Sequence, residues 1–288
     1  MKIIHIMSIA ACLGVLQSCN IINPEEPVPA YIAIDKLTLQ ADYTTQGSSS
    51  SAFSDAWLYV DNQSIGGFEI PTIVPVIADE GNHLINIAAG VKASGFENIR
   101  SLLALFTFYD TTVYLKPGVV SYFSPVLKYK EAAKFDYIED FDDGGIEFIK
   151  YNNSSDTTFY ATNVNPFEGD YSAIAWLDNT RKSMAVVSKD AYVIDKNRLN
   201  IIEVNYKCST SFNIGVSKNI FGGTSEPIPF LTLYPTSVWK KIYIDLSPII
   251  GANVNFNAIN YKLYISAFLD ADKTSGDIQI DNLKLVHL

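Results

Sequence analysis

The feature that most constrains the fold of this chain is a series of short segments in which apolar and polar residues alternate. In Ile202–Cys208 and in Ile242–Leu246 every second residue is apolar, which is the two-residue period of a strand with one buried face. Turn-forming residues separate such segments, and no long stretch has a helical period. The pattern predicts an all-β protein, and it places Cys208 on a buried face.

The spacing of the expected strands divides the chain into two parts. From residue 135 onward the strands are longer, whereas those before residue 130 are short and follow one another closely. The 270 residues after residue 18 (288 − 18) suit two domains. We predict a small N-terminal β-sandwich at 31–130 and a larger C-terminal β-sandwich at 135–288. The strands expected in the first are 31–42, 57–60, 65–70, 84–89, 101–109, 112–115 and 122–127, with a hairpin turn at 61–64. Gly66–Gly67 permits a bulge or a close backbone approach.

The start of the chain has the layout of a secretory signal peptide. Lys2 precedes an apolar run from Ile3 to Leu16, which is shorter than the roughly 20 residues that a membrane-spanning helix needs. Residues 16–19, Leu-Gln-Ser-Cys, resemble the lipobox of bacterial lipoproteins. The resemblance implies cleavage after residue 18 and an acyl lipid on Cys19 that anchors the protein to a membrane. The alternative is an ordinary signal peptide cut near Ser18.

Residues 19–30 are predicted to form an extended tether, because they contain three prolines within six residues. The pair Glu25–Glu26 resembles acidic signals that send lipoproteins to the outer face of the outer membrane. We therefore expect an outer-membrane protein exposed at the cell surface. The periplasmic face of the same membrane is the alternative.

Charge and cysteine content exclude several classes of function. Without Lys2 the chain has 20 basic and 31 acidic residues, a balance of −11. Such an acidic body is repelled by phosphates, so no nucleic acid is expected as a partner. Cys208 is the one cysteine after Cys19, so the body has no intramolecular disulfide and depends on its apolar core.

Residues 57–66 and 81–87 resemble PEGA-like domains of bacterial surface proteins, in which a "VDG…G" hairpin is followed by a "G-x-H-x-I-x-I" strand. Here Asn62 stands where the family has glycine. The resemblance implies an Ig-like spacer or adhesion module without catalytic chemistry. His83 could be a metal ligand, but no second histidine lies nearby in the sequence, so we expect a structural role at the entry of a strand.

Residues 140–144, 167–172, 239–241 and 280–283 resemble the jelly-roll sandwiches of carbohydrate-binding modules and galactose-binding-like domains. The resemblance implies a structural calcium ion bound by Asp142, the region of Glu168, and Asp281, with oxygen ligands that suit Ca²⁺. The alternative is a solvated acidic turn. The alternation in 278–285 changes phase, which predicts a bulge at Asp281–Asn282.

Sugar binding by such modules needs exposed aromatic rings, for which Trp176, Trp239 and Tyr160 are the candidates. The alternative for each is half-buried packing.

Neither histidine of the mature chain, His83 or His287, lies in a catalytic motif, and no metalloprotease or phosphate-binding motif is present. We therefore expect no enzyme activity. The leading hypothesis is a lipid-anchored cell-envelope protein whose C-terminal jelly roll binds a glycan or an envelope partner. The alternative is an accessory or scaffold subunit of an outer-membrane protein complex, and a glycan hydrolase ranks below both.

Overall fold

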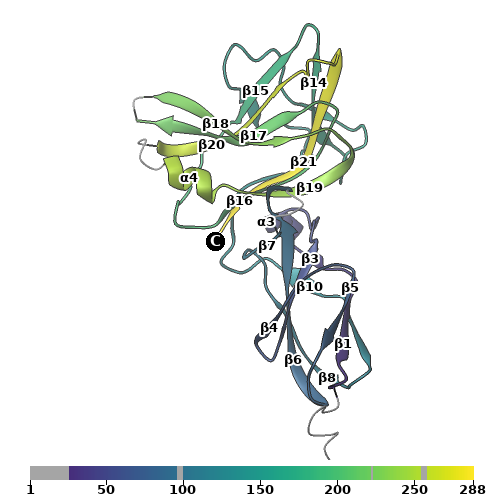
Figure 1. Ribbon diagram of the computed structural model, residues 1–288. Coiled ribbons are helices and arrows are strands. Elements are labelled where there is room, and N and C mark those ends of the chain that lie inside the picture. The colour runs from purple at the N-terminus through teal and green to yellow at the C-terminus, as the bar shows by residue number, and fades with distance from the viewer. Residues whose placement is uncertain (1–25, 96–99, 222, 254–257) are drawn as a thin grey trace, which may run out of the picture.

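Figure 1 shows the computed structural model, which describes residues 26–95, 100–221, 223–253 and 258–288. The expected signal peptide, Cys19 and the first part of the tether lie outside the described residues. Among the described residues, strands make up 58% and helices 5%, so the all-β prediction is confirmed. Within the described ranges, no helix is long and apolar enough to cross a membrane.

The N-terminal body combines three sheets around one apolar core. Their strand orders are β5-β1-β9, β10-β2, and β4-β3-β6-β7 with β8 also paired to β6. The strands are β1 Ala30–Ile34, β2 Thr38–Gln40, β3 Asp55–Val60, β4 Gln63–Glu69, β5 Thr72–Val76, β6 Gly81–Lys92, β7 Arg100–Leu102, β8 Tyr109–Leu115, β9 Val120–Phe123 and β10 Val126–Lys128. A one-turn helix, α3 (Tyr43–Gln46), and a 3₁₀ turn, η1 (Ala93–Gly95), complete it.

The predicted β3–β4 hairpin is present. Asp61 and Asn62 have φ angles of 51° and 65°, as a two-residue turn with matching twist requires. The register shifts beside Gly66, so a bulge is present there.

The strand predicted at 101–109 is wrong, because β7 ends at Leu102 and β8 begins at Tyr109. The intervening residues do not alternate. Leu105 and Phe106 are instead buried in the core, and the Phe106 ring meets the Tyr243 ring of the C-terminal body edge-on, with centroids 6.2 Å apart. The segment predicted as one strand at 31–42 likewise divides into β1 and β2.

The C-terminal body is the predicted jelly-roll sandwich. A six-stranded sheet in the order β13-β14-β21-β16-β19, with β11 beside β21, faces a five-stranded sheet in the order β12-β15-β20-β17-β18. Buried side chains of both sheets form its core. The strands are β11 Lys134–Glu139, β12 Phe148–Lys150, β13 Tyr160–Thr162, β14 Ser172–Asp178, β15 Ser183–Ser188, β16 Asn200–Cys208, β17 Phe212–Ile220, β18 Thr224–Leu233, β19 Thr236–Asp245, β20 Ala258–Phe268 and β21 Ser275–His287, and the helix α4 is Ser247–Asn253.

Strand β16 is buried on both faces, which corrects the expectation of a single buried face. Ile202, Val204 and Cys208 point into the sandwich core as predicted. The polar residues between them, Glu203 and Asn205, are also buried. They lie on the outer face of the six-stranded sheet, where the N-terminal body covers it (Figure 1).

The junction of the two bodies continues the N-terminal core. Ile201, Tyr243 and Val286 lie on three strands of the six-stranded sheet, yet their side chains belong to the apolar cluster of the N-terminal body. In Figure 1 the C-terminal body stands on the N-terminal body, with β16, β19 and β21 at the junction. The two bodies therefore share a packed interface.

Candidate functional site

Two of the predicted metal ligands, Asp142 and Asp281, contact the loop between β13 and β14, residues 163–171, and the third, Glu168, lies in that loop. The Asp142 carboxylate accepts hydrogen bonds from the amides of Asp170 and Tyr171 at 2.7 and 3.0 Å. The Asp281 carboxylate accepts from the amides of Phe167 and Glu168 at 2.9 and 3.3 Å. These carboxylates therefore hold the loop onto the sheet.

The carboxylates of the same three residues are engaged in hydrogen bonds within the protein. Among the described residues, no group of three or more His, Cys, Asp or Glu side chains is arranged to hold a metal ion. Amide and hydroxyl donors already bond to the carboxylates of Asp142, Glu168 and Asp281. Calcium would have to displace these donors, because it needs 6–8 oxygen ligands. Calcium binding stays a prediction from the resemblance alone.

The predicted bulge at Asp281–Asn282 is confirmed. Asn282 has a φ of 47°, and the register between β16 and β21 shifts between Glu203 and Asn205. The bulge keeps Ile280 and Leu283 on the core face and turns Asp281 toward the loop. Burial raises the pKa of Asp281 to about 7, although its amide donors act in the opposite direction.

Trp239 packs against its neighbours. Its Nε1 donates a hydrogen bond to the carbonyl of Asn165 at 3.2 Å. The Phe167 ring packs edge-on against the Trp239 ring, with the two centroids 5.9 Å apart. The Lys207 ammonium lies 5.1 Å from the ring centroid. Trp239 therefore anchors the β13–β14 loop, and this position does not favour it as a platform for a sugar.

Trp176 and Tyr160, in contrast, are 50% and 53% exposed. Tyr160 pairs with Ile174 across β13 and β14, so Trp176, two residues further along β14, lies on the same sheet face. Diagonal neighbours of this kind are about 7–8 Å apart. The two exposed side chains are therefore near neighbours on the outer face of the sheet, and we call this part of the face the aromatic surface.

Polar groups border this aromatic surface. Asp277 is the cross-strand partner of Trp176. The Arg181 guanidinium bonds to the Asp178 carboxylate at 2.6 Å. The pKa of Arg181 is raised by Asp178 and, to a smaller extent, by the nearby Tyr160. The surface therefore offers ring faces together with charged hydrogen-bonding groups.

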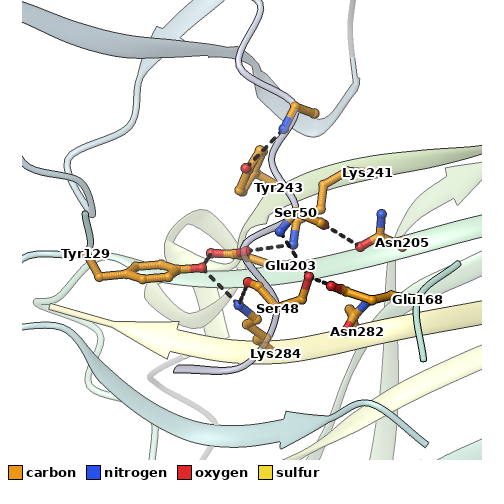
Figure 2. Close-up of polar contacts among 11 residues, drawn as sticks. Ser48, Ser50, Tyr129, Glu168, Glu203, Asn205, Lys241, Tyr243, Asn282 and Lys284 are labelled. Atoms are coloured by element: carbon orange, nitrogen blue, oxygen red, sulfur yellow. Dashed lines mark hydrogen bonds and ion pairs between the residues drawn. The ribbon is translucent and has the colours of Figure 1, made fainter. Parts of the chain in front are cut away.

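Sequence reasoning missed a buried polar cluster at the junction of the two bodies, drawn in Figure 2. Glu203 and Lys284 are completely buried. The Tyr129 hydroxyl donates to the Glu203 carboxylate at 2.8 Å, and the Lys241 ammonium forms an ion pair with the same carboxylate at 2.9 Å. The Lys284 ammonium donates to the Ser48 carbonyl at 2.6 Å and to the Tyr129 hydroxyl at 3.2 Å.

The charges of this cluster depend on one another. Burial would raise the pKa of Glu203, but Lys241 and Lys284 outweigh it and lower that pKa. Burial lowers the pKa of Lys284 to about 8, although Glu203 opposes the shift. Burial also raises the pKa of Tyr129. One carboxylate thus offsets two ammonium groups that water does not reach.

The serine-rich segment at 48–52 joins the two bodies, although its composition suggests a simple loop. Its alternate residues contact successive strands of the six-stranded sheet (Figure 2). The Ser48 carbonyl meets Lys284 of β21, and the Ser50 hydroxyl donates to Asn205 of β16 at 2.9 Å. The Ala52 amide donates to the Tyr243 hydroxyl of β19 at 3.3 Å. The Ser48 hydroxyl also bonds to Glu168, which links the β13–β14 loop to this junction.

The two histidines of the body occupy structural positions. His83 contacts the Asp61 carboxylate at 2.6 Å and the Asp79 carbonyl at 2.8 Å, where it ties together the β3–β4 turn and the start of β6. His287 lies 3.0 Å from Asp136. Within the described part of the chain, neither ring is hydrogen-bonded to a serine, threonine or cysteine.

Comparisons with known proteins found distant similarities to solved structures. No family model matches the chain, and no curated protein matches it. The xylan-binding CBM22-1 domain of Xyn10C from Paenibacillus barcinonensis is 12% identical over 55% of this chain and 97% of its own, with a TM-score of 0.39. A structure from a study of promiscuous carbohydrate-binding modules of the β-sandwich superfamily is also 12% identical, over 91% of this chain and 99% of its own, with a TM-score of 0.39.

The enzymatically active domain of tailspike protein 4 from bacteriophage CBA120 is 9% identical over 52% of this chain and 20% of its own, with a TM-score of 0.40. These identities and TM-scores carry no argument about function. What this chain binds has to be argued from its own residues.

Proposed function

We propose that this chain is a lipid-anchored, non-catalytic protein of the cell envelope whose C-terminal jelly roll binds a glycan. The observation that supports glycan binding is the exposed pair Trp176 and Tyr160 on one face of adjacent strands. Flat rings of this kind stack on the apolar faces of pyranose rings. Asp277 and Arg181 supply acceptors and donors for hydroxyl groups at the border of the surface.

The lipid anchor rests on the lipobox-like residues 16–19 and the apolar run before them. Two acyl chains suffice to hold a protein on a bilayer. Delivery to the outer membrane, with the body facing the cell surface, is the localisation that we propose. Mass spectrometry of the mature protein tests the anchor, because the proposal requires a fatty-acylated Cys19 at its amino terminus.

The glycan proposal is tested with residues 20–288 as a soluble protein on glycan arrays, followed by calorimetry with any bound glycan. Trp176→Ala is expected to weaken binding about fivefold or more, because loss of a stacked ring is worth on the order of 1 kcal/mol or more. Phe268→Ala is the control, since Phe268 is an exposed ring on the other sheet. Blank arrays, or equal effects of the two substitutions, would refute the proposal.

A further inference from the structure

The outer face of the sheet β5-β1-β9 is apolar along its whole described length. Residues that alternate with the buried Ile32, Val74 and Val76 point outward. On β1 these are Tyr31 and Ala33, and on the flanking strands each outward position is also apolar. The outward residues of β5 and β9, with Ile77 just beyond β5, are Ile73, Pro75, Ile77, Val120 and Tyr122. We call this set the apolar face.

Three large side chains of this face are mostly exposed, whereas Ala33 at its centre is buried. Ile73 is 58% exposed, Ile77 70% and Tyr122 80%. The register places Ile73 and Tyr122 on either side of Ala33, so they belong to one continuous surface. None of the outward positions within the three strands is charged, although the whole protein has a formal charge of −10. The carboxylate of Asp35, just beyond β1, borders the face, because Asp35 lines a hollow with Ile73 and Tyr122. A contiguous exposed apolar surface of this kind marks a contact site.

The path of the chain indicates what covers the apolar face. Its central strand, β1, begins at Ala30, eleven residues after Cys19 (30 − 19). Eleven extended residues span at most about 40 Å. The amide of Gly118 donates to the Pro29 carbonyl at 2.9 Å, so the tether joins the body at the end of this sheet where Val28 and Val119 are also exposed.

We infer that the apolar face docks on the lipid bilayer to which the chain is anchored, so that the N-terminal body lies against the membrane. The inference rests on the lipid anchor of the proposed function. Aliphatic side chains enter the outer acyl region, and Tyr122 has the amphipathic ring that is enriched at membrane interfaces. Asp79 and Glu80 lie close to Ile77 in the sequence, so the docking is apolar in character and favours zwitterionic lipid.

The test supplies the tether artificially, so that it does not depend on acylation. Residues 20–288 carry a hexahistidine tag in place of Cys19 and are bound to phosphatidylcholine vesicles that contain a nickel-chelating lipid. An environment-sensitive fluorophore is attached to Tyr122→Cys or Ile77→Cys. Val193→Cys is the control, since Val193 is 78% exposed on the C-terminal body. The native Cys208 is buried and does not compete for the label.

The label at positions 77 and 122 is expected to shift to the blue and to lose at least half of its emission with lipids brominated on their acyl chains. The label at 193 is expected to do neither. Unquenched emission at 77 and 122 from protein that is bound to the vesicles would overturn the inference. A blue shift that grows with surface density but is not quenched by bromine would also overturn it, in favour of pairing between two copies.

These outcomes are separate from those of the proposed function. A negative result leaves glycan binding and acylation of Cys19 untouched, because the tag replaces the lipid and no glycan is present. Conversely, a mature protein without acyl chains would remove the anchor while leaving the vesicle measurement as it is. A second variant, Ile73→Asp with the label at 77, is expected to abolish the quenching. It is expected to stay folded, because Ile73 is exposed.

Discussion

Replacing Glu203 by Gln tests whether the buried cluster at the junction holds the two bodies together. The substitution keeps the shape of the side chain but removes the carboxylate that forms an ion pair with Lys241 in the cluster. At 2.9 Å and an effective dielectric constant of about 20, the lost attraction is about 6 kcal/mol. Part of it is offset by relaxation and water entry, and removal of one partner from buried pairs costs about 3–5 kcal/mol.

We therefore expect Glu203→Gln to lower the free energy of unfolding by about 3–5 kcal/mol at pH 7, measured by urea denaturation with circular dichroism and tryptophan fluorescence. Since the cluster lies between the bodies, the two signals are also expected to separate into distinct transitions. Glu147→Gln is the matched control, because Glu147 pairs with Lys189 in an exposed ion pair that is worth about 1 kcal/mol or less.

The double variant Glu203→Gln, Lys241→Met supplies the internal check. It removes the cation that the single variant leaves without its partner, so part of the lost stability is expected to return. Two outcomes would refute a stabilising role for the cluster. One is that Glu203→Gln lowers the free energy of unfolding no more than Glu147→Gln does. The other is that the double variant loses more stability than the two single variants, Glu203→Gln and Lys241→Met, lose together.

Three other predictions concern the same junction and the core. The pKa of Lys284 is about 8 in the folded protein and about 10.4 when unfolded, so the unfolded chain binds more protons between these values. The stability of the native protein relative to Lys284→Met should therefore rise by about 3 kcal/mol from pH 8 to pH 10.5, as urea denaturation across this range will show. Gly47 has a φ of 68°, and an added Cβ would lie 2.9 Å from Ile138. Gly47→Ala should cost about 1–3 kcal/mol more than Gly144→Ala, which has positive φ but open space, when both are compared by thermal unfolding. Burial raises the pKa of Cys208 to about 11, so its thiol should react with a disulfide reagent only at the rate of unfolding, and rapid reaction of the native protein would contradict this.

The alternating pattern alone specifies much of the fold. A two-residue period defines a strand and its buried face, because successive side chains point to opposite sides. This is why β16, β19 and the inward position of Cys208 are predictable, and why the phase change in β21 locates the bulge at Asp281–Asn282. The turn at Asp61 and Asn62 is predictable for a similar local reason, since these residues tolerate positive φ.

The contacts of the candidate site are harder to predict from a local pattern. The local sequence does not show whether an aromatic ring on a strand is exposed, as in Trp176, or packed, as in Trp239. The difference is made by Asn165, Phe167 and Lys207, which approach Trp239 from other parts of the chain. The carboxylates of Asp142 and Asp281 likewise hold a loop whose position no local pattern specifies.

The sequence by itself therefore determined the strands, their inward faces and the bulge, because each depends on neighbouring residues. Only the tertiary structure decided that Glu203, Asn205 and Lys284 are buried, and that Ser48 and Ser50 contact the six-stranded sheet. Polar residues alternate with apolar ones in the same way whether the polar face of a strand meets water or is covered by another body. The residues that cover these side chains are distant in the sequence. Tyr129 lies more than 70 positions from Glu203, and Ser48 lies more than 200 positions from Lys284. A local period carries no information over such separations.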